Sequence, residues 1–411
     1  MAKTHINGQL KNLIELNRSQ LHLNPSLPYS LKETIKSLVA NPLREEKSER
    51  NFNGEKEAKS EEGPLVWVLS SGTSSFHHDQ YKLIALTHKA FISSAEAVNK
   101  HLQVSKQDIW INILPHFHVG GLGIFYRALI SSTEVCNLWS PEVKWNPQVF
   151  VQACKEAQAT LTSLVPTQVY DLVRENLLAP PSLRAVVVGG AHLNQALYDK
   201  ARDLGWPLLP SYGMTEACSQ IATASLESLK SRSSAPPLQI LEHVQVKQIE
   251  SSSQLMIKGP SLLNGFYLIL NGKSQEWCHP LDSEGWFLTQ DCAQIERPFI
   301  SLSLRVDDIV KIKGEMVNLS TLRHRLDQLC LKLDLHIDCT ICGVPDDRDG
   351  HKLTLIGEAS SESLHQLFIA FNELVLPFEK LSRYIDSVEI PRNSLGKILQ
   401  NQLAESIRSR V

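Results

Sequence analysis

Short apolar runs and amphipathic segments alternate along the first half of the chain. The runs predict buried strands at 65–69, 109–114, 134–139, 161–165, 183–188 and 208–209. The segments with helical spacing predict helices at 120–131, 147–157, 166–175 and 194–204. Such alternation requires crossover connections, so it predicts an α/β fold with a parallel sheet that helices cover on both faces.

The pattern changes twice further along the chain. After about Ser225, short strands with polar turns at 244–249, 255–258, 265–270 and 286–289 predict a small β-rich subdomain. From Arg305 onward, strands at 339–343 and 353–358 and helices at 319–333 and 364–374 predict a small α+β domain. Residues 1–62 predict short helices followed by a polar loop.

Composition restricts the class of protein. The 411 residues carry a formal net charge of -3, which gives no electrostatic case for nucleic-acid binding. No apolar run approaches the ~18 residues of a membrane span, and the first residues lack the apolar core of a signal peptide. Eight scattered cysteines predict reduced thiols and a cytoplasmic protein. Cys339 and Cys342 stand in a strand-like run, where they would face opposite sides, so their spacing does not indicate a redox or metal site.

Two glycine-containing stretches follow predicted strands. The first is Gly189-Gly190-Ala191, and the second runs from Pro210 to Glu216 with the letters PSYGMTE. Glycine after a strand lets the backbone approach a ligand closely, and an aromatic ring offers a flat face for a base. The hydroxyl and the carboxylate that follow suit a phosphate and a divalent cation. The alternative is an ordinary helix start, where Thr and Glu are also common.

Further polar groups suit a nucleotide, each with a structural alternative. The hydroxyl-rich turn 70–75, followed by Lys82, suits a phosphate, although a solvated serine-rich loop has the same composition. Asp291 and Arg305 suit a ribose diol, and the alternative is a surface ion pair. Lys397 stands on a glycine turn, where a lysine is solvated unless a mobile domain delivers it to an active site.

The segment from His116 to Ser131 suits a second pocket. His116 and His118 lack a second ligand pair with zinc spacing, so they are interpreted as pocket lining before the Gly120-Gly121 helix start. Arg127 is the only charged residue of the predicted helix and needs an anionic partner. That partner is either a structural carboxylate or a carboxylate of the substrate, and both remain open.

A series of motifs resembles the acyl-adenylate-forming (AMP-dependent synthetase/ligase) superfamily, from about Leu65 to the C-terminus. In the order of the family they are SSGTSS with Lys82, SYGMTE, GWFLTQD, LRVDD, KIKGEMV, CGVPDDRDG and PRNSLGKI. The stretches LPHFHVGGLGIFYRAL, LTSLVPTQVYDLV and LRAVVVGGAHLNQAL are most similar to o-succinylbenzoate–CoA ligases. The resemblance implies a large N-terminal AMP-binding and acyl-substrate domain at 1–304 and a mobile C-terminal domain at 305–411.

The resemblance also implies a role for each motif residue. Thr215 would contact the α-phosphate, Glu216 the magnesium ion and Lys397 both the substrate carboxylate and the α-phosphate. Asp307 would be the hinge, and 311–315 would turn toward the site in the thioester step. The nucleotide would be bound by Ser70, Ser71, Gly72, Thr73, Lys82, Gly189, Gly190, Ala191, Ser211, Tyr212, Gly213, Met214, Asp291 and Arg305. The acyl substrate would be bound by His118, Gly121 and Arg127, with Arg127 at the distal carboxylate.

The implied activity is an ATP-dependent acid–CoA ligase that acts on 2-succinylbenzoate in menaquinone or phylloquinone biosynthesis, with ATP, magnesium and CoA. Three features depart from the family pattern: the long loop from Ser74 to Tyr81, the short segment before it, and Gln290 in place of a glycine. One alternative is therefore a ligase of the same superfamily with another carboxylic acid. The other is a degenerate protein that binds nucleotide or acyl adenylate without turnover.

Overall fold

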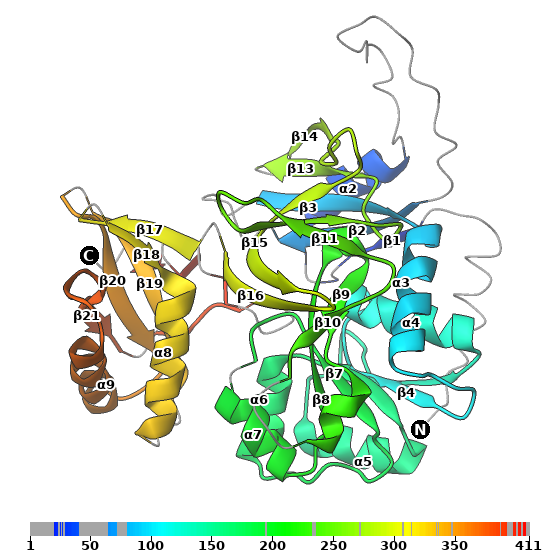
Figure 1. The fold of residues 1–411 in the computed structure, drawn as a ribbon, viewed down its shortest axis with the longest axis horizontal. Coiled ribbons are helices and arrows are strands. Elements are labelled where there is room, and N and C mark those ends of the chain that lie inside the picture. Colours follow the sequence, from blue (N-terminus) through cyan, green and yellow to red (C-terminus); the bar gives the residue numbers. More distant parts are fainter. Residues whose placement is uncertain are drawn as a thin grey trace, which may run out of the picture.

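Figure 1 shows the computed structural model of the chain as a ribbon. The structure describes residues 20–23, 25, 27, 29–40, 65–71, 80–193, 195–231, 236–270, 273–305, 308–313, 315–333, 335, 337–346, 348–386, 388–392, 398–399, 402–403 and 406–407. Within these ranges, the first three quarters of the chain contain two large sheets, and two smaller sheets of two and three strands follow.

The first sheet contains the strands that flank the predicted phosphate loop. Its order is β1 (Gln20–His22), β2 (Leu65–Ser71), β3 (Gln80–Thr87), β13 (Gly265–Leu270) and β14 (Lys273–Cys278). Helix α2 (Tyr29–Ala40) covers it through Leu31 and Ile35. A helix was predicted before residue 63 and α2 confirms it, but the prediction missed β1, which pairs in parallel with β2. Three residues are too few to show the alternation that reveals a strand.

The second sheet begins with a parallel half that confirms the predicted α/β alternation. Its strands are β4 (Ile109–Asn112), β5 (Glu134–Asn137), β6 (Leu161–Leu164), β7 (Ala185–Val188) and the first residues of β8 (Leu208–Met214). Helices α3 (His88–His101) and α4 (Val119–Ser131) pack on one face. Helices α5 (Pro147–Ala157), α6 (Pro166–Arg174) and α7 (Gln195–Asp203) pack on the other. Figure 1 shows these two helical layers on either side of the strands.

The same sheet continues with antiparallel strands, so it is mixed. Its order is β11-β12-β15-β16-β10-β9-β8-β7-β6-β4-β5. The added strands are β9 (Ser219–Thr223), β10 (Leu238–Ile240), β11 (Gln245–Gln248), β12 (Gln254–Lys258), β15 (Phe287–Glu296) and β16 (Phe299–Arg305). The short helix η1 (Thr215–Ala217) lies between β8 and β9 in sequence, and η2 (Leu226–Lys230) lies between β9 and β10.

The antiparallel strands predicted after Ser225 are present as β11, β12, β13 and β15, but they join the two large sheets and form no sheet of their own among the described residues. β9 folds back on β8 and pairs with it in the antiparallel direction. The following strands then pair with β9 and with one another, so they extend the existing sheet. β13 and β14 instead join the first sheet. Short turns force antiparallel pairing, but sequence alone does not show which edge a hairpin joins.

The C-terminal part, defined here as the described residues from Ile309 onward, has its own cores. It contains β17 (Ile309–Ile312), β18 (Glu315–Asn318), α8 (Leu319–Lys332), β19 (Cys339–Asp346), β20 (Gly350–Gly357), α9 (Ser361–Leu374), η4 (Pro377–Glu379) and β21 (Leu381–Ile385). Two hydrophobic clusters consist only of residues from this part. Figure 1 shows it to one side of the two large sheets. The domain boundary at 304/305 stays a prediction.

The Cys339-x-x-Cys342 spacing does not bring the two thiols together. Cys339 packs at the cluster around Leu322 and Phe371, whereas Cys342 belongs to the cluster on the other face of the sheet. The prediction that they face opposite sides is confirmed. The sulfur that Cys339 contacts is that of Cys330 in α8, at 3.7 Å.

One buried carboxylate joins the starts of three parallel strands. Asp108 precedes β4, Thr160 precedes β6 and Arg184 precedes β7. Asp108 Oδ1 accepts from Arg184 Nε at 2.7 Å and from Thr160 Oγ1 at 2.7 Å. Asp108 Oδ2 accepts from Arg184 Nη2 at 2.8 Å and from the Ser105 amide at 2.8 Å. This network fixes the edge of the sheet opposite the carboxyl ends of the strands.

We expect Asp108→Asn to lower stability at neutral pH and to weaken its acid dependence. Burial raises the pKa of Asp108, but the hydrogen bonds from Arg184, Ser105 and Thr160 outweigh burial and hold the pKa at about 2, against an ordinary 3.8. The stabilisation, roughly 2 kcal/mol, is therefore present above about pH 4 and is lost as the pH falls toward 2. Melting temperatures between pH 3 and 7 test this, with the exposed Asp199→Asn as control. Equal acid dependence in wild type and Asp108→Asn would contradict it.

Candidate active site

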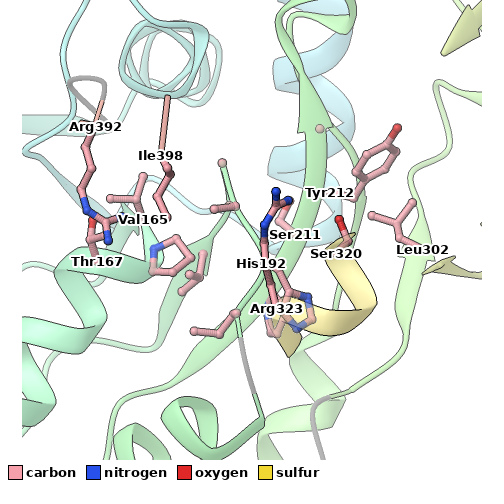
Figure 2. Close-up of a pocket in the computed structure, with 18 of the residues that line it drawn as sticks. Val165, Thr167, His192, Ser211, Tyr212, Leu302, Ser320, Arg323, Arg392 and Ile398 are labelled. Atoms are coloured by element: carbon pink, nitrogen blue, oxygen red, sulfur yellow. The ribbon is translucent and has the colours of Figure 1, made fainter. Parts of the chain in front are cut away.

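A cleft of about 2810 Å³ opens at the carboxyl ends of the parallel strands, between the large sheets and the C-terminal part. Figure 2 shows residues from both sides of it: Val165, Thr167 and His192 from the parallel half, and Ser320 and Arg323 from α8. The predicted site residues that line it are Ser70, Lys82, His118, Arg127, Gly189, Gly190, Ala191, Ser211, Tyr212, Gly213, Met214, Thr215, Glu216 and Asp291. This is the position at which parallel α/β sheets bind ligands.

The loop after β7 forms one wall of the cleft. Gly189 donates its amide to the Leu164 carbonyl at 3.2 Å, which holds the loop against the end of β6. Gly190 has a φ of +88°, a conformation that side chains rarely adopt. The glycine at 190 therefore allows the chain to turn sharply and to expose its backbone to the cleft.

Gly213 was expected in a turn after a strand. It lies inside a strand instead. β8 continues to Met214 and pairs antiparallel with β9, with a register shift between Tyr212 and Gly213. A Cβ at Gly213 would lie 1.8 Å from the carbonyl oxygen of Ser219. Thr215 and Glu216 then begin the three-residue helix η1, so a helix does start here, but it is a single short turn.

Tyr212 and Asp291 are both buried and joined. The Tyr212 hydroxyl donates to Asp291 Oδ2 at 2.7 Å, and each residue is 8% exposed. Asp291 lies opposite Arg305 in the β15–β16 pairing, so both predicted ribose-binding residues stand on neighbouring strands. The tyrosine hydroxyl thus fixes the orientation of a carboxylate at the wall of the cleft.

The residues predicted to bind phosphate and magnesium lie close together near the end of β2 in the first sheet. Ser70 of β2 lies opposite Lys82 of β3, and Lys82 Nζ lies 3.8 Å from Glu216 Oε1. Magnesium typically takes one or two protein carboxylates and completes its shell with phosphate oxygens and water, so Glu216 beside the Thr215 hydroxyl fits such an ion. Among the described residues, no group of three or more His, Cys, Asp or Glu side chains could hold a metal without such help.

The structure extends β3 into the expected loop from Ser74 to Tyr81. Gln80 and Tyr81 are strand residues, whereas 72–79 lie outside the described residues. Gly72, Thr73, Asp307 and Lys397 also lie outside them. Ser71 and Arg305 are placed as the last residues of β2 and β16. The roles of all six stay predictions.

Of the residues predicted to bind the acyl substrate, His118 and Arg127 line the cleft from the N-cap and the C-terminal half of α4. His118 lines the cleft, and burial lowers its pKa to about 4, so it is neutral at physiological pH. His116 instead bonds Asn137 Oδ1 at 2.9 Å. Gly121 is not part of the described lining: a Cβ there would lie 2.4 Å from the Pro115 carbonyl oxygen, so this glycine lets α4 pack against the preceding loop.

Arg127 is a buried cation that lines the cleft, with 2% of its surface exposed. Its Nη2 donates to Ser219 Oγ at 3.3 Å, and its guanidinium lies 5.6 Å from the centroid of the Trp110 ring. Nη1 has no hydrogen-bond partner, and no described carboxylate forms an ion pair with Arg127. Burial lowers its pKa to about 10, so the side chain is still charged at neutral pH. Of the two partners left open by the sequence, a structural carboxylate is therefore absent from the described residues.

Two polar residues of this pocket were missed by sequence reasoning. Ser163 lines the cleft from β6 with its hydroxyl buried and without a partner, and Ser219 is the hydrogen-bond partner of Arg127. Ser163 carried one signal, because it is a polar residue within a short run of fully buried strand positions. Ser219 carried none, since its place depends on how β9 folds back on β8.

Among the helices of the described residues, none is both long and apolar enough to cross a membrane.

Comparisons with known proteins agree with this geometry. The model of the AMP-binding enzyme family matches residues 11–267. A 2-succinylbenzoate–CoA ligase of Staphylococcus aureus (strain MSSA476) is 26% identical over 346 residues, which cover 82% of this chain and 66% of that protein. The chain thus spans about two thirds of the length of the curated relatives it matches.

Solved structures share the fold. A variant of E. coli MenE with bound OSB-AMS has a TM-score of 0.70 and 20% identity. The match covers 97% of this chain and 84% of the MenE chain. The o-succinylbenzoate coenzyme A synthetase (MenE) of Bacillus subtilis, in complex with ATP and magnesium ion, has a TM-score of 0.66 and 20% identity, with 98% and 82% covered.

We expect Tyr212→Phe to weaken nucleotide binding while leaving the ring in place. Without its hydroxyl, Asp291 loses a hydrogen bond of 2.7 Å to a charged acceptor, which is worth about 1.5–3 kcal/mol. The dissociation constant of ATP should rise by roughly 10-fold or more in calorimetry. Tyr170→Phe, a partly exposed tyrosine of α6, is the control. Unchanged ATP affinity in Tyr212→Phe would show that Asp291 is not oriented through this bond.

Proposed function

The chain belongs to the AMP-binding enzyme family, and on that premise we propose that it is an ATP-dependent acid–CoA ligase for 2-succinylbenzoate. In the first half-reaction the substrate carboxylate attacks the α-phosphorus of ATP, and the bond to diphosphate breaks. In the second, the CoA thiol attacks the carbonyl of the acyl adenylate, loses its proton, and AMP leaves. The product would serve menaquinone or phylloquinone biosynthesis.

The observation that carries the choice of substrate is Arg127, which lines the cleft without an ion-pair partner among the described residues. A buried guanidinium without an anion is costly, and the described residues supply no carboxylate. A dicarboxylic substrate with one carboxylate at the nucleotide and the other at Arg127 would supply it. A guanidinium binds a carboxylate through two parallel hydrogen bonds, and Nη1 lacks a partner for such a contact.

Ser163 supports the same orientation of the substrate. Its hydroxyl is buried in the cleft wall without a partner and can donate to a carbonyl or carboxylate oxygen. An aromatic keto diacid offers both kinds of oxygen between the ring and its distal end. His118 is neutral, so it would add no charge to the wall of the cleft, and Arg127 would be the residue that selects the anion.

The nucleotide would bind along the other wall of the cleft. Its base would stack on Tyr212 beside 189–191, and its ribose hydroxyls would bond Asp291 and Arg305. Glu216 and Thr215 would hold magnesium with the phosphates, and the ion would offset negative charge at the α-phosphorus. Lys82 now pairs with Glu216 at 3.8 Å, so its ammonium would exchange this carboxylate for a phosphate oxygen.

Lys397 would complete the adenylation site from the C-terminal domain, proposed here as 305–411. Lys397 lies outside the described residues, but Arg392 and Ile398 on either side form an isolated bridge and both line the cleft. Figure 2 labels Arg392 and Ile398, together with Thr167 and Val165, among the residues that line the pocket. This position supports delivery of the lysine for adenylation. Rotation of the domain, with Asp307 as hinge, would then bring 311–315 to the site for the thioester step.

Diphosphate release measured with 2-succinylbenzoate, ATP and magnesium, with and without CoA, tests the proposed function. Release that depends on the diacid, with 2-succinylbenzoyl-CoA as product, supports it. Turnover of another acid alone would assign a different ligase of the family. ATP binding without turnover of any acid would favour a degenerate binding protein.

We expect Arg127→Ala to raise the KM for 2-succinylbenzoate by roughly 10- to 150-fold, which corresponds to the loss of a charge-assisted pair. Affinity for ATP should be nearly unchanged, and the preference for the diacid over benzoate-like monoacids should narrow. Arg127→Met, which keeps most of the volume, controls for the cavity. A variant that only melts earlier, with unchanged selectivity, would make Arg127 a structural residue.

For Lys397→Ala we expect adenylation to fall by roughly 10²–10³-fold, because one preorganised cation at the developing charge is lost. Thioester formation from supplied acyl adenylate should be retained. The two half-reactions are measured separately, as diphosphate release without CoA and as CoA thioester formation from the adenylate. Lys380→Ala, an exposed lysine of the C-terminal part, is the control. Equal loss in both half-reactions would count against the assignment.

A further inference from the structure

A single segment connects the large mixed sheet to the C-terminal part. β16 ends at Arg305, which lies opposite Asp291 in the sheet, and β17 begins at Ile309. Asp308 directly precedes β17, whereas residues 306 and 307 lie outside the described residues. The contacts of Asp308 therefore show to which side of the connection this residue belongs.

The carboxylate of Asp308 is held by the first turns of α8. Arg323 Nη1 donates to Asp308 Oδ1 at 2.8 Å, and the Ser320 hydroxyl donates to Oδ2. Arg323 Nε also donates to the carbonyl of Ile341 in β19 at 2.9 Å. Side-chain exposure in the ion pair is only 18% for Arg323 and 19% for Asp308, so water screens it less than a surface pair. One guanidinium thus joins the connecting segment, α8 and β19, the strand at one edge of the three-stranded C-terminal sheet.

These contacts attach the two ends of the connecting segment to different parts of the protein. Arg305 is held by the ladder of the large sheet, and Asp308 is held to the body of the C-terminal part through α8 and β19. Any rotation of the C-terminal part that keeps these contacts takes place before Asp308. A short pivot restricts the orientations that the C-terminal part can reach.

We propose that Arg323, with Ser320, clamps Asp308 and sets the C-terminal limit of the pivot. Arg323 is then a positioning residue: it touches no reacting group and acts by restricting the connection. This role rests on the proposed function, since it matters for a domain that alternates between two poses. Releasing the clamp lengthens the free connection, which lowers the effective concentration of each productive pose.

Limited trypsin digestion of the full chain without nucleotide tests the clamp independently of activity. Cleavage after Arg305 requires the connection to open, so its rate follows the population of the open form. We expect Arg323→Ala to accelerate this cleavage by about tenfold, as loss of a charge-assisted pair predicts. Fragments ending at Arg305 are identified by mass spectrometry.

Arg325→Ala is the matched control. Arg325 lies on the same helix, pairs with Glu379 at 3.0 Å within the C-terminal part, and has no described bond to the connection. Both variants lose one ion pair and one tryptic site. Equal acceleration in the two variants, or none in Arg323→Ala, would overturn the clamp.

A second pair of variants keeps the test valid if Arg323→Ala does not fold. Asp308→Asn keeps the shape of the side chain and removes its charge, and Arg323→Lys keeps a charge that cannot bond both Asp308 and Ile341 in the same way. Both should cleave at rates between wild type and Arg323→Ala, with melting temperatures like that of Arg325→Ala. Unchanged cleavage in Asp308→Asn would contradict the clamp.

In an active enzyme, both half-reactions of these variants should slow several-fold in kcat with little change in KM. A chain without ligase activity but with the predicted cleavage pattern would refute the proposed function and retain the clamp.

Discussion

The close approach of two backbone segments at Gly213 is the constraint on which both halves of the site depend. A methyl group there would lie 1.8 Å from the Ser219 carbonyl oxygen, so only glycine permits β8 and β9 to pair as they do. The tight turn between them also needs Cys218 at a φ of 57° and Ser219 at 134°. The chain thus reverses within a few residues at the edge where the sheet changes from parallel to antiparallel.

This reversal joins the two walls of the cleft that are proposed to bind the nucleotide and the acyl substrate. On the β8 side it places Tyr212 against Asp291 and brings Thr215 and Glu216 to the cleft. On the β9 side it places Ser219 beside the guanidinium of Arg127. A change at Gly213 would therefore disturb both pockets at once, although neither pocket contains a side chain from that position.

Local elements were predictable where caps and periodicity agree. The helix 147–157 was predicted with its observed bounds, because Asn146 caps it and proline occupies its first position. The edges of sheets were not predictable. Which strand a hairpin joins depends on contacts far apart in sequence, and β1 is too short to show a period. For the same reason the neighbour of Cys339 is Cys330 and not Cys342.

The candidate site follows the same division between local and distant information. Tyr212 and Asp291 were predicted as site residues from their sequence motifs. The hydrogen bond between them was not predicted, because 79 positions separate them in the sequence. Arg127 was found as a lone charge on an apolar helix, and both an internal and an external partner remained open. Only the packed structure reveals that Trp110 and Ser219 occupy its surroundings and that no described carboxylate does.

The lone cation also explains how such a pocket can discriminate. A guanidinium over an aromatic face and one hydroxyl retains part of its interaction energy, so the empty protein can keep it charged and buried. In the proposed function, a monoacid would desolvate this pocket without giving the cation an anionic partner. A diacid would avoid that penalty, since its second carboxylate would pair with Nη1. Selectivity would then arise more from the cost imposed on the wrong ligand than from attraction of the right one.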